Sequence, residues 1–279
     1  MSNAAIAEAI ESGVLPGRVW FYPNYHCNLA CSYCLTESAP SSPRRLLAPD
    51  QILRLAEQAA ELGFTDFGIT GGEPFLLPEL PALLAQLAAI RPTIALSNGT
   101  VFGDRRLAQL EPLAGLDLAI QISLDAPTAD LNDELRGPDN FAAVVAAVPR
   151  LVDMGIRVRI ATTVEPDRLD EAQHAELCAL HRSLGVSDDD HLVRPIIRRG
   201  RAAMEALGAT FAHTQIPAEL TISADGAFWS PFGPTVTDGH VATDLLVTRT
   251  IEPLERPATA LLGLVTGLPE GADAAIGIR

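Results

Sequence analysis

Three of the four cysteines of the chain lie within one short stretch, NYHCNLACSYCL, at residues 24–35. Cys27, Cys31 and Cys34 follow a Cys-x3-Cys-x2-Cys spacing, and thiolates grouped in this way are soft ligands for zinc or for an iron–sulfur cluster. A structural zinc site needs four ligands, and the remaining cysteine, Cys178, is remote in the sequence. The spacing therefore favours an iron–sulfur cubane with one iron free of protein ligands, and zinc remains the alternative.

The whole chain is acidic, which bears on its partners. Its 279 residues include 20 basic and 35 acidic ones, which gives a formal charge of −15. This balance disfavours a broad electrostatic surface for nucleic acid or for an anionic membrane. The sequence contains no apolar stretch long enough to span a bilayer, and its start does not resemble a signal peptide. We therefore expect a cytoplasmic protein without a membrane partner, and we do not expect nucleic acid as the substrate.

Short apolar runs alternate with helix-like stretches over much of the chain. The runs predict strands at 18–23, 64–70, 93–99, 116–125, 156–164 and 191–197. Amphipathic stretches between these runs predict helices, so the strands should be parallel and joined by right-handed crossovers. Six such units suit an α/β fold of the partial (β/α)6 TIM-barrel type, with an open parallel sheet as the alternative.

The alternating pattern ends near residue 202, which divides the chain into three predicted parts. In the last part, residues 220–230 predict a β-hairpin that turns at Asp225-Gly226, and a short helix is expected in the PATALLGLV stretch. The predicted parts are an N-terminal segment at 1–17, a barrel at 18–202 and a C-terminal extension at 203–279.

Four unusual stretches are predicted to share one rim of the barrel. The cysteine stretch follows the first predicted strand, and TGGEP, SNGT and SLDAP follow the second, third and fourth. Because the carboxyl ends of parallel strands meet at one end of a barrel, function is expected to gather there.

At these residues the chain resembles the radical S-adenosylmethionine (SAM) superfamily. The carriers of the resemblance are the CxxxCxxC spacing after a first strand and the aromatic Tyr33 before the last cysteine. The resemblance implies that Cys27, Cys31 and Cys34 hold one [4Fe-4S] cluster, whose open iron binds SAM. It also implies reductive cleavage of SAM to a 5′-deoxyadenosyl radical that abstracts hydrogen from the substrate. The electron donor implied is a flavodoxin or a ferredoxin.

The other rim motifs match SAM-binding segments of that family. Gly71 and Gly72 would let the backbone come close to SAM, and Arg136 would bind its carboxylate. Pro195 lies in the VRPIIRRGRA segment that resembles the strand bordering adenine. The resemblance implies cofactor contacts from Tyr33, Gly71, Gly72, Glu73, Pro74, Ser97, Asn98, Ser123, Asp125, Arg136 and Pro195.

Each motif also has a purely structural interpretation. Gly71-Gly72 and Asn98-Gly99 are ordinary turn dipeptides, and Arg136 could be a surface arginine. A run of arginines in the last barrel segment is most simply a solvated edge. Its members are Arg194, Arg198, Arg199 and Arg201.

The SLDAP, LRG and RRGRA motifs and the tail resemble one subgroup of the superfamily. That subgroup contains molybdenum-cofactor cyclases, sulfatase maturases and quinone-peptide maturases. The resemblance implies modification of a ribosomally made peptide or protein, with a small molecule such as a sugar, nucleotide or amino acid as the alternative substrate. The alternative of a different class is a non-catalytic iron–sulfur or zinc protein.

In peptide-maturing relatives, the C-terminal extension often carries auxiliary clusters. The extension of this chain differs from it. Ser230 and Pro231 lie near the place where a cysteine would commonly follow the hairpin, and no cysteine occurs after Cys178. Hydroxyl groups do not replace thiolates as cluster ligands. We therefore expect one cluster only, and a SPASM/twitch-like scaffold without cluster ligands.

One further group of ligating side chains lies on the predicted helix at 168–185. His174, Cys178 and His181 are spaced i, i+4 and i+7, so they share one helix face. A second metal site is one interpretation of this face. We favour the other, an outer barrel helix with a half-buried thiol and two surface histidines.

Overall fold

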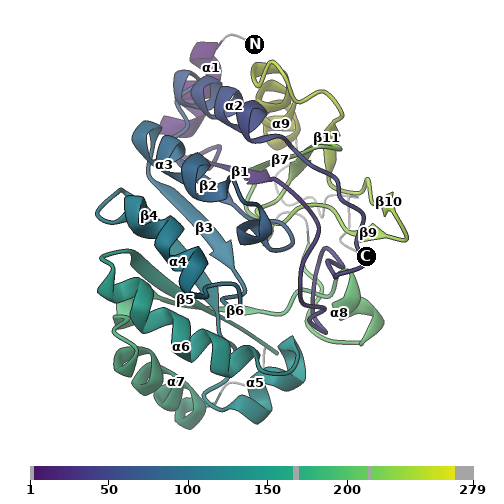
Figure 1. Cartoon of the computed structure of the whole chain (residues 1–279). Helices are drawn as coiled ribbons and strands as arrows, with labels where there is room; N and C mark the ends of the chain where they lie inside the picture. The colour runs from purple at the N-terminus through teal and green to yellow at the C-terminus, as the bar shows by residue number, and fades with distance from the viewer. Residues whose placement is uncertain (1–2, 166–169, 213–214, 268–279) are drawn as a thin grey trace.

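A curved nine-stranded sheet forms the centre of the molecule in the computed structural model, which describes residues 3–165, 170–212 and 215–267 (Figure 1). Its strand order is β11-β8-β7-β1-β2-β3-β4-β5-β6. The strands are β1 Arg18–Tyr22, β2 Asp66–Ile69, β3 Thr93–Ser97, β4 Leu118–Ser123, β5 Arg157–Val164, β6 His191–Pro195, β7 Leu220–Ser223, β8 Gly226–Trp229 and β11 Leu246–Thr248. A separate ribbon pairs β9 Val236–Thr237 with β10 His240–Val241.

Helices cover the outer face of this sheet, apart from the short α8, which lies beside the cysteine stretch (Figure 1). They are α1 Asn3–Glu11, α2 Pro49–Glu61, α3 Leu80–Ile90, α4 Asp104–Leu110, α5 Ala129–Arg136, α6 Asn140–Asp153, α7 Glu171–Ser183, α8 Arg201–Met204 and α9 Glu255–Gly267. Short 3-10 turns lie at η1 Pro74–Leu76, η2 Glu111–Leu113 and η3 Asp188–Asp190.

Strands β1 to β6 are parallel and pair in chain order, as a partial (β/α)6 barrel requires. This confirms the predicted fold class and the six predicted strands. Three helices were not predicted. They are α1, which packs against α9, α5, which precedes α6 after the fourth strand, and the short α8 after β6. The predicted start of the helix at 168–185 lies partly outside the described residues, and α7 begins at Glu171.

The C-terminal hairpin continues the barrel sheet. Strands β7 and β8 form the predicted hairpin, and β7 pairs in parallel with β1. The hairpin therefore braces the strand that leads into the cysteine stretch. Residues 268–279, the end of the predicted extension, lie outside the described part of the chain.

The two faces of the barrel sheet differ in character because side chains alternate along a strand. In β5, Val158 and Ile160 belong to the large apolar core under the helices. The residues between and after them, such as Arg159 and Thr163, therefore face the barrel interior. A small apolar cluster that includes Trp20 lines the interior on β1, β3 and β4.

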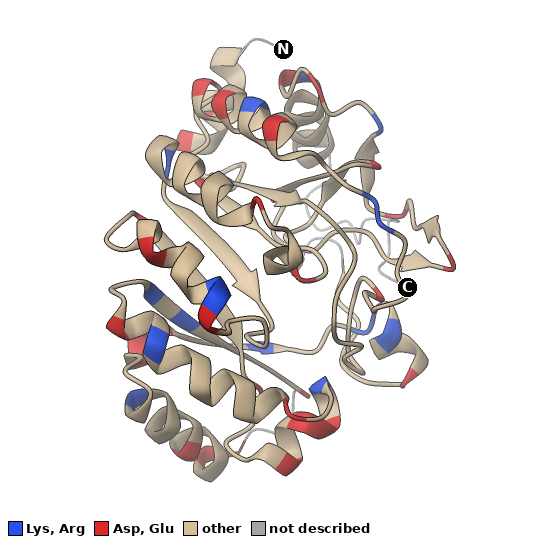
Figure 2. Cartoon of the chain, in the orientation of Figure 1, with Lys and Arg blue, Asp and Glu red and all other residues tan. Residues whose placement is uncertain are grey.

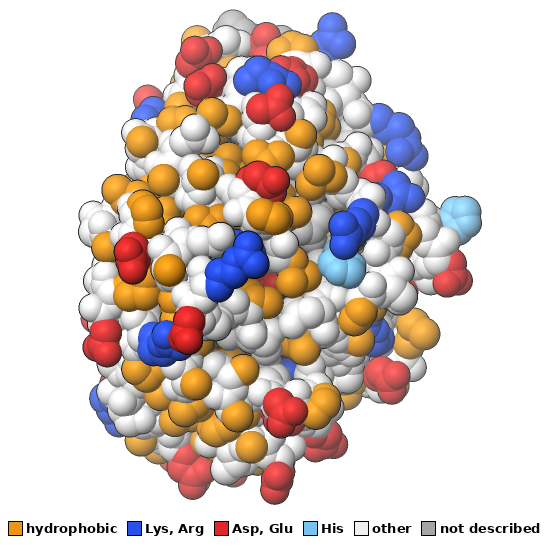
Figure 3. Space-filling view, viewed as in Figure 1, with side chains coloured by type: hydrophobic (Ala, Val, Ile, Leu, Met, Phe, Trp, Pro, Cys, Tyr) orange, Lys and Arg blue, Asp and Glu red, His pale blue; other side chains and the backbone are white. Residues whose placement is uncertain are grey.

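Charged side chains are dispersed over the molecule. Figure 2 shows acidic residues spread over the outer helices, with basic residues placed singly among them. On the face seen in Figure 3, charged and apolar side chains alternate without a continuous basic patch. None of the described helices has the length and apolar character needed to cross a membrane.

Candidate functional site

The cysteine loop, residues 24–35, follows β1 at the carboxyl ends of the barrel strands. The amide of Ser32 donates to Leu135 O at 2.9 Å, which fastens the loop to the end of α5. Burial raises the pKa of Cys27 to about 12 and also raises that of Cys31, where Arg136 opposes the effect. These thiols therefore stay protonated unless a metal compensates the charge of the thiolates.

The donor set of the loop fits an iron–sulfur cluster. Three soft thiols lie on one loop, and Cys178 is on α7 beside two histidines, away from the loop. Two N–H groups approach the Cys27 sulfur, the amide of Leu29 at 3.4 Å and the Asn98 side chain at 3.6 Å. Such donors are the groups by which proteins adjust sulfur ligands of clusters.

Gly71 and Gly72 are required by a close approach of two backbones. Gly72 donates to Asn24 O at 3.0 Å, and the next residue, Glu73, donates to His26 O at 2.9 Å. A Cβ atom on Gly71 would lie 2.3 Å from Asn24 O, and one on Gly72 would lie 2.2 Å from His26 O. The two glycines therefore do more than form a turn. Because they lack side chains, the end of β2 can lie in direct backbone contact with the cysteine loop.

Glu73 turns its side chain into the protein. Its carboxylate is fully buried and accepts hydrogen bonds from the amides of Phe75 at 3.0 Å and Asn98 at 2.7 Å. The Ser97 hydroxyl donates to it at 3.1 Å. Burial raises the pKa of Glu73 to about 7, while these donors act to lower it. The carboxylate thus joins the ends of β2 and β3, next to Pro74, which is buried in η1.

Two asparagines continue this network around the rim. Asn140 Nδ2 donates to Asn98 O at 3.1 Å, and Asn132 Nδ2 donates to Asn140 Oδ1 at 2.9 Å. The Asn132 side chain then accepts from the amide of Asp125 at 3.0 Å. Both asparagines are fully buried. Sequence reasoning missed them, although asparagine inside a helix such as α5 is unfavourable unless it makes a buried hydrogen bond.

The network returns to the cysteine loop through a buried ion pair. Arg136 Nη1 lies 3.1 Å from Asp125 Oδ2, and the Tyr33 hydroxyl donates to the same carboxylate oxygen. The other carboxylate oxygen accepts from the amide of Thr163 at 2.8 Å. Arg136 also donates to the Tyr33 hydroxyl and lies over its ring. Burial refutes the interpretation of Arg136 as a surface arginine.

Arg201 holds the opposite side of the cysteine loop. Its guanidinium donates to Cys31 O at 2.6 Å and to Ser38 O at 2.8 Å. The preceding Gly200 has φ +57°, and a Cβ there would lie 2.2 Å from Leu35 O. The segment therefore packs directly on the loop backbone.

The solvated-edge interpretation of the arginine run is right for two members and wrong for two. Arg194 and Arg198 are exposed. Arg199 is buried and paired with Asp244, and Arg201 binds the loop. Arg199 and Arg201 were assigned wrongly because the chain turns toward the cysteine loop after β6. The periodicity of the sequence does not show this turn.

The remaining predicted residues lie at the same rim without contacts to the loop thiols. Ser123 ends β4 and is partly exposed, and Pro195 ends β6 and is exposed. Tyr33, Glu73, Ser97, Asn98, Asp125 and Arg136 form the connected part of the predicted set. Direct contact of any of them with SAM remains a prediction.

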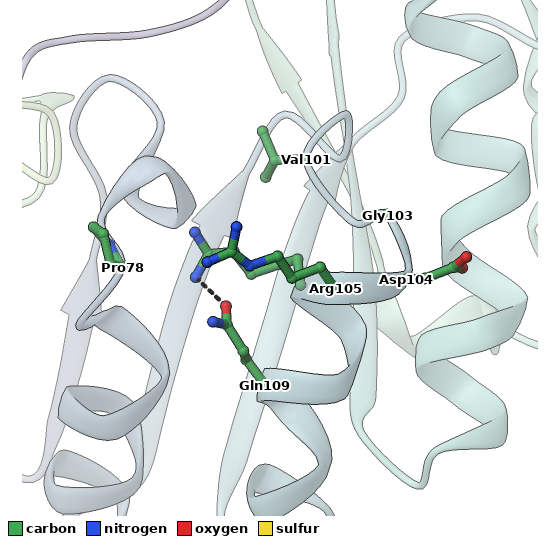
Figure 4. A pocket seen from close by; sticks show the side chains of 7 residues that line it. Pro78, Val101, Gly103, Asp104, Arg105 and Gln109 are labelled. Atoms are coloured by element: carbon green, nitrogen blue, oxygen red, sulfur yellow. Dashed lines mark hydrogen bonds between the residues drawn. The ribbon is translucent and has the colours of Figure 1, made fainter.

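A surface pocket of about 460 Å³ lies between the loop before α3 and the start of α4 (Figure 4). Arg105, Arg106 and Gln109 reach into it, and Arg106 donates to Gln109 at 2.9 Å. None of the predicted site residues lines this pocket. It is therefore distinct from the rim that carries the cysteines.

Comparison with known proteins decides the family. A sequence model described as "Radical SAM superfamily" matches residues 21–178, more than half of the chain. The chain belongs to the radical SAM superfamily. Radical SAM enzymes use a [4Fe-4S] cluster and SAM, and the donor set of the loop agrees with this chemistry.

Relatives of this radical SAM enzyme differ in what their names state. GTP 3′,8-cyclase from Microcystis aeruginosa is 32% identical over 163 residues, which cover 55% of this chain and 49% of the cyclase. The structure titled "Native anSMEcpe with bound AdoMet" matches with a TM-score of 0.61 and 12% identity, over 86% of this chain and 79% of that one. The structure of SuiB from Streptococcus suis bound to S-adenosylmethionine matches with a TM-score of 0.56 and 20% identity, over 68% of this chain and 43% of SuiB.

The matches support different conclusions. At 12% and 20% identity, the two solved structures show a shared fold. The chain spans about half the length, or less, of the first curated relatives that it matches. The shared segment is the radical SAM part, so the substrate is not carried over with it.

The replacement Glu73→Gln is expected to lower the free energy of unfolding by about 1–3 kcal/mol, because an amide N–H would oppose one of the buried donors. Chemical denaturation of the full chain measures this. Glu79→Gln, at an exposed position before α3, is the matched control and should change stability by less than about 0.5 kcal/mol. Equal effects of the two replacements would contradict the assigned role of Glu73.

The replacement Asp125→Asn is expected to cost about 3–5 kcal/mol of folding stability, because it leaves the buried Arg136 without its counter-charge. The control is Asp66→Asn, whose partner Arg18 is one-third exposed, and it should cost no more than about 1 kcal/mol. A loss below 1 kcal/mol for Asp125→Asn, measured by denaturation, would show that Arg136 does not depend on this carboxylate.

The replacement Arg201→Gln is expected to loosen the cysteine loop. It removes the hydrogen bonds to Cys31 O in the loop and to Ser38 O just after it, each worth about 1.5–3 kcal/mol for a charged donor, so iron should leave at least about tenfold faster. The measurement is iron retained per chain during incubation of the reconstituted protein with a chelator. Arg198→Gln, on the exposed part of the same segment, should match the unaltered protein. Unchanged iron loss in Arg201→Gln would remove Arg201 from this role.

Proposed function

We propose that this radical SAM enzyme modifies a ribosomally made peptide or protein. The supporting observation is the free edge of β6. Strand β6 ends the sheet order, and among the described residues no strand pairs with its outer side. Leu192, Val193, Arg194 and Pro195 on this strand are all exposed.

An exposed strand edge is a ready partner for an extended peptide. Its unpaired main-chain groups can add the peptide as a further strand, with side chains selecting the sequence. Because β6 points toward the rim, a peptide added along it would end near the cysteine loop. The titles of two similar structures name bound peptides, which agrees with this proposal.

The chain's own residues have distinct tasks in the proposed reaction. When bound, the cluster supplies the electron that cleaves SAM, and Cys27, Cys31 and Cys34 would hold it. Arg136 would bind the SAM carboxylate: its Nε is buried and, among the described residues, has no hydrogen-bond partner. Asp125 holds this guanidinium in place.

A second candidate is a small anionic substrate, and one arginine at the barrel mouth favours it. The exposed Arg194 donates to Thr163 at 3.2 Å from the face of β6 that continues the barrel interior, whereas Arg159 on β5 is already paired with Asp190. Guanidinium groups in a barrel interior suit a carboxylate or phosphate. The name GTP 3′,8-cyclase of several relatives points in the same direction.

The two candidates predict different stimulants of SAM cleavage. The anaerobically reconstituted and reduced enzyme should form 5′-deoxyadenosine faster with members of a synthetic peptide library than without substrate, and the stimulating peptide should change in mass. Hydrogen exchange of β6 amides should slow with that peptide, whereas exchange of β3 amides should not. If GTP or other nucleotides stimulate cleavage and peptides do not, the second candidate replaces the first.

A further inference from the structure

A second group of metal-ligating side chains lies on the outer face of the barrel, between α7 and β6. His174, Cys178 and His191 place one ligand atom each so that all three lie within 4.8 Å of one another. The first two come from α7, and His191 is the first residue of β6. The group is separate from the cysteine loop and from the residues that connect to it.

The sulfur-to-nitrogen distances are close to those of a bound ion. Cys178 Sγ lies 3.8 Å from His174 Nε2 and 3.9 Å from His191 Nδ1. Around a tetrahedral zinc ion, bonds of about 2.3 Å to sulfur and about 2.0 Å to nitrogen place sulfur and nitrogen about 3.5 Å apart and two nitrogens about 3.3 Å apart. The two sulfur-to-nitrogen distances need shifts of a few tenths of an ångström, and the two histidine nitrogens, now within 4.8 Å of one another, would close around the ion.

The hydrogen bonds of His191 fix which ring nitrogen is available. The Thr162 hydroxyl donates its single proton to Leu124 O at 2.8 Å, so its oxygen accepts from His191 Nε2 at 2.9 Å. The proton of the neutral ring is therefore on Nε2, and the lone pair of Nδ1 points toward Cys178. Metal-binding histidines are commonly oriented by such a hydrogen bond on the other nitrogen.

His181 provides an independent indication. Its ring packs edge-on against His191, with centroids 4.2 Å apart, and it is fully buried. Within the described residues, neither of its ring nitrogens has a hydrogen-bond partner. The expectation of two surface histidines on α7 is thus wrong for His181, whose buried ring packs against His191 beside this group.

We propose that His174, Cys178 and His191 bind a zinc ion, with His181 or water in the fourth position. One thiolate and imidazole nitrogens are the ligands that zinc prefers. Binding would release the Cys178 thiol proton to solvent. The ion would fasten α7 to β6, a contact that otherwise rests on few side chains, since Leu177 and His181 are the buried residues of α7.

Zinc uptake by the full chain with its cluster assembled tests this site. After removal of loosely bound metal, elemental analysis should find about one zinc per chain, and hydrogen exchange of α7 amides should slow on zinc addition. Cys178→Ser should abolish this uptake while leaving iron content and SAM cleavage unchanged. His240→Ala, at an exposed histidine elsewhere, should bind zinc normally.

A second variant and a second metal keep the test decisive. Thr162→Val removes the hydrogen bond that orients His191 and should weaken zinc affinity by about 10–100-fold. Cobalt added to the cluster-loaded protein should give thiolate-to-metal absorption that Cys178→Ser removes. Absence of zinc uptake, or uptake that Cys178→Ser does not change, would overturn the proposal. Neither outcome depends on which substrate the enzyme modifies.

Discussion

The rim of the barrel depends on a closed circuit of buried hydrogen bonds that begins and ends on the cysteine loop. It leads from His26 through Glu73 to the end of β3, crosses helices α6 and α5, and returns through Asp125 to Tyr33. A buried polar group without a partner is costly, so every member restricts the positions of its neighbours. The position of the cysteine loop therefore depends on residues from three strand ends and two helices outside it.

The C-terminal part of the chain completes this support from the other side. Thr235 Oγ1 donates to Leu35 O at 2.8 Å, and Val236 N donates to Thr36 O at 3.2 Å, just after the cysteine loop. Strand β7 pairs with β1, which leads into the same loop. A tail without cysteines thus has a structural task here, because it clamps the loop between the rim circuit and the hairpin.

Sequence patterns predicted the six barrel strands and the shared rim, because alternation and strand-end motifs are local signals. They did not predict that the side chains of Glu73 and Ser97 bind each other, since that contact joins two strand ends 24 residues apart in the chain. Arg201 and His191 were likewise missed as site residues. Each acts through a partner on a distant segment, which helical spacing alone cannot identify.

Strand β6 takes part in both proposals. Its edge would bind the peptide substrate, and its first residue, His191, would bind the zinc ion. An exposed strand edge invites aggregation, and natural proteins usually protect it. Here His191 contacts α7 on the outer face, and no strand among the described residues pairs with the outer edge of β6. The proposed metal ion would tie β6 to α7 through His191, at the end of the strand away from the cysteine loop. The proposed peptide would then pair with the edge that the described residues leave without a strand.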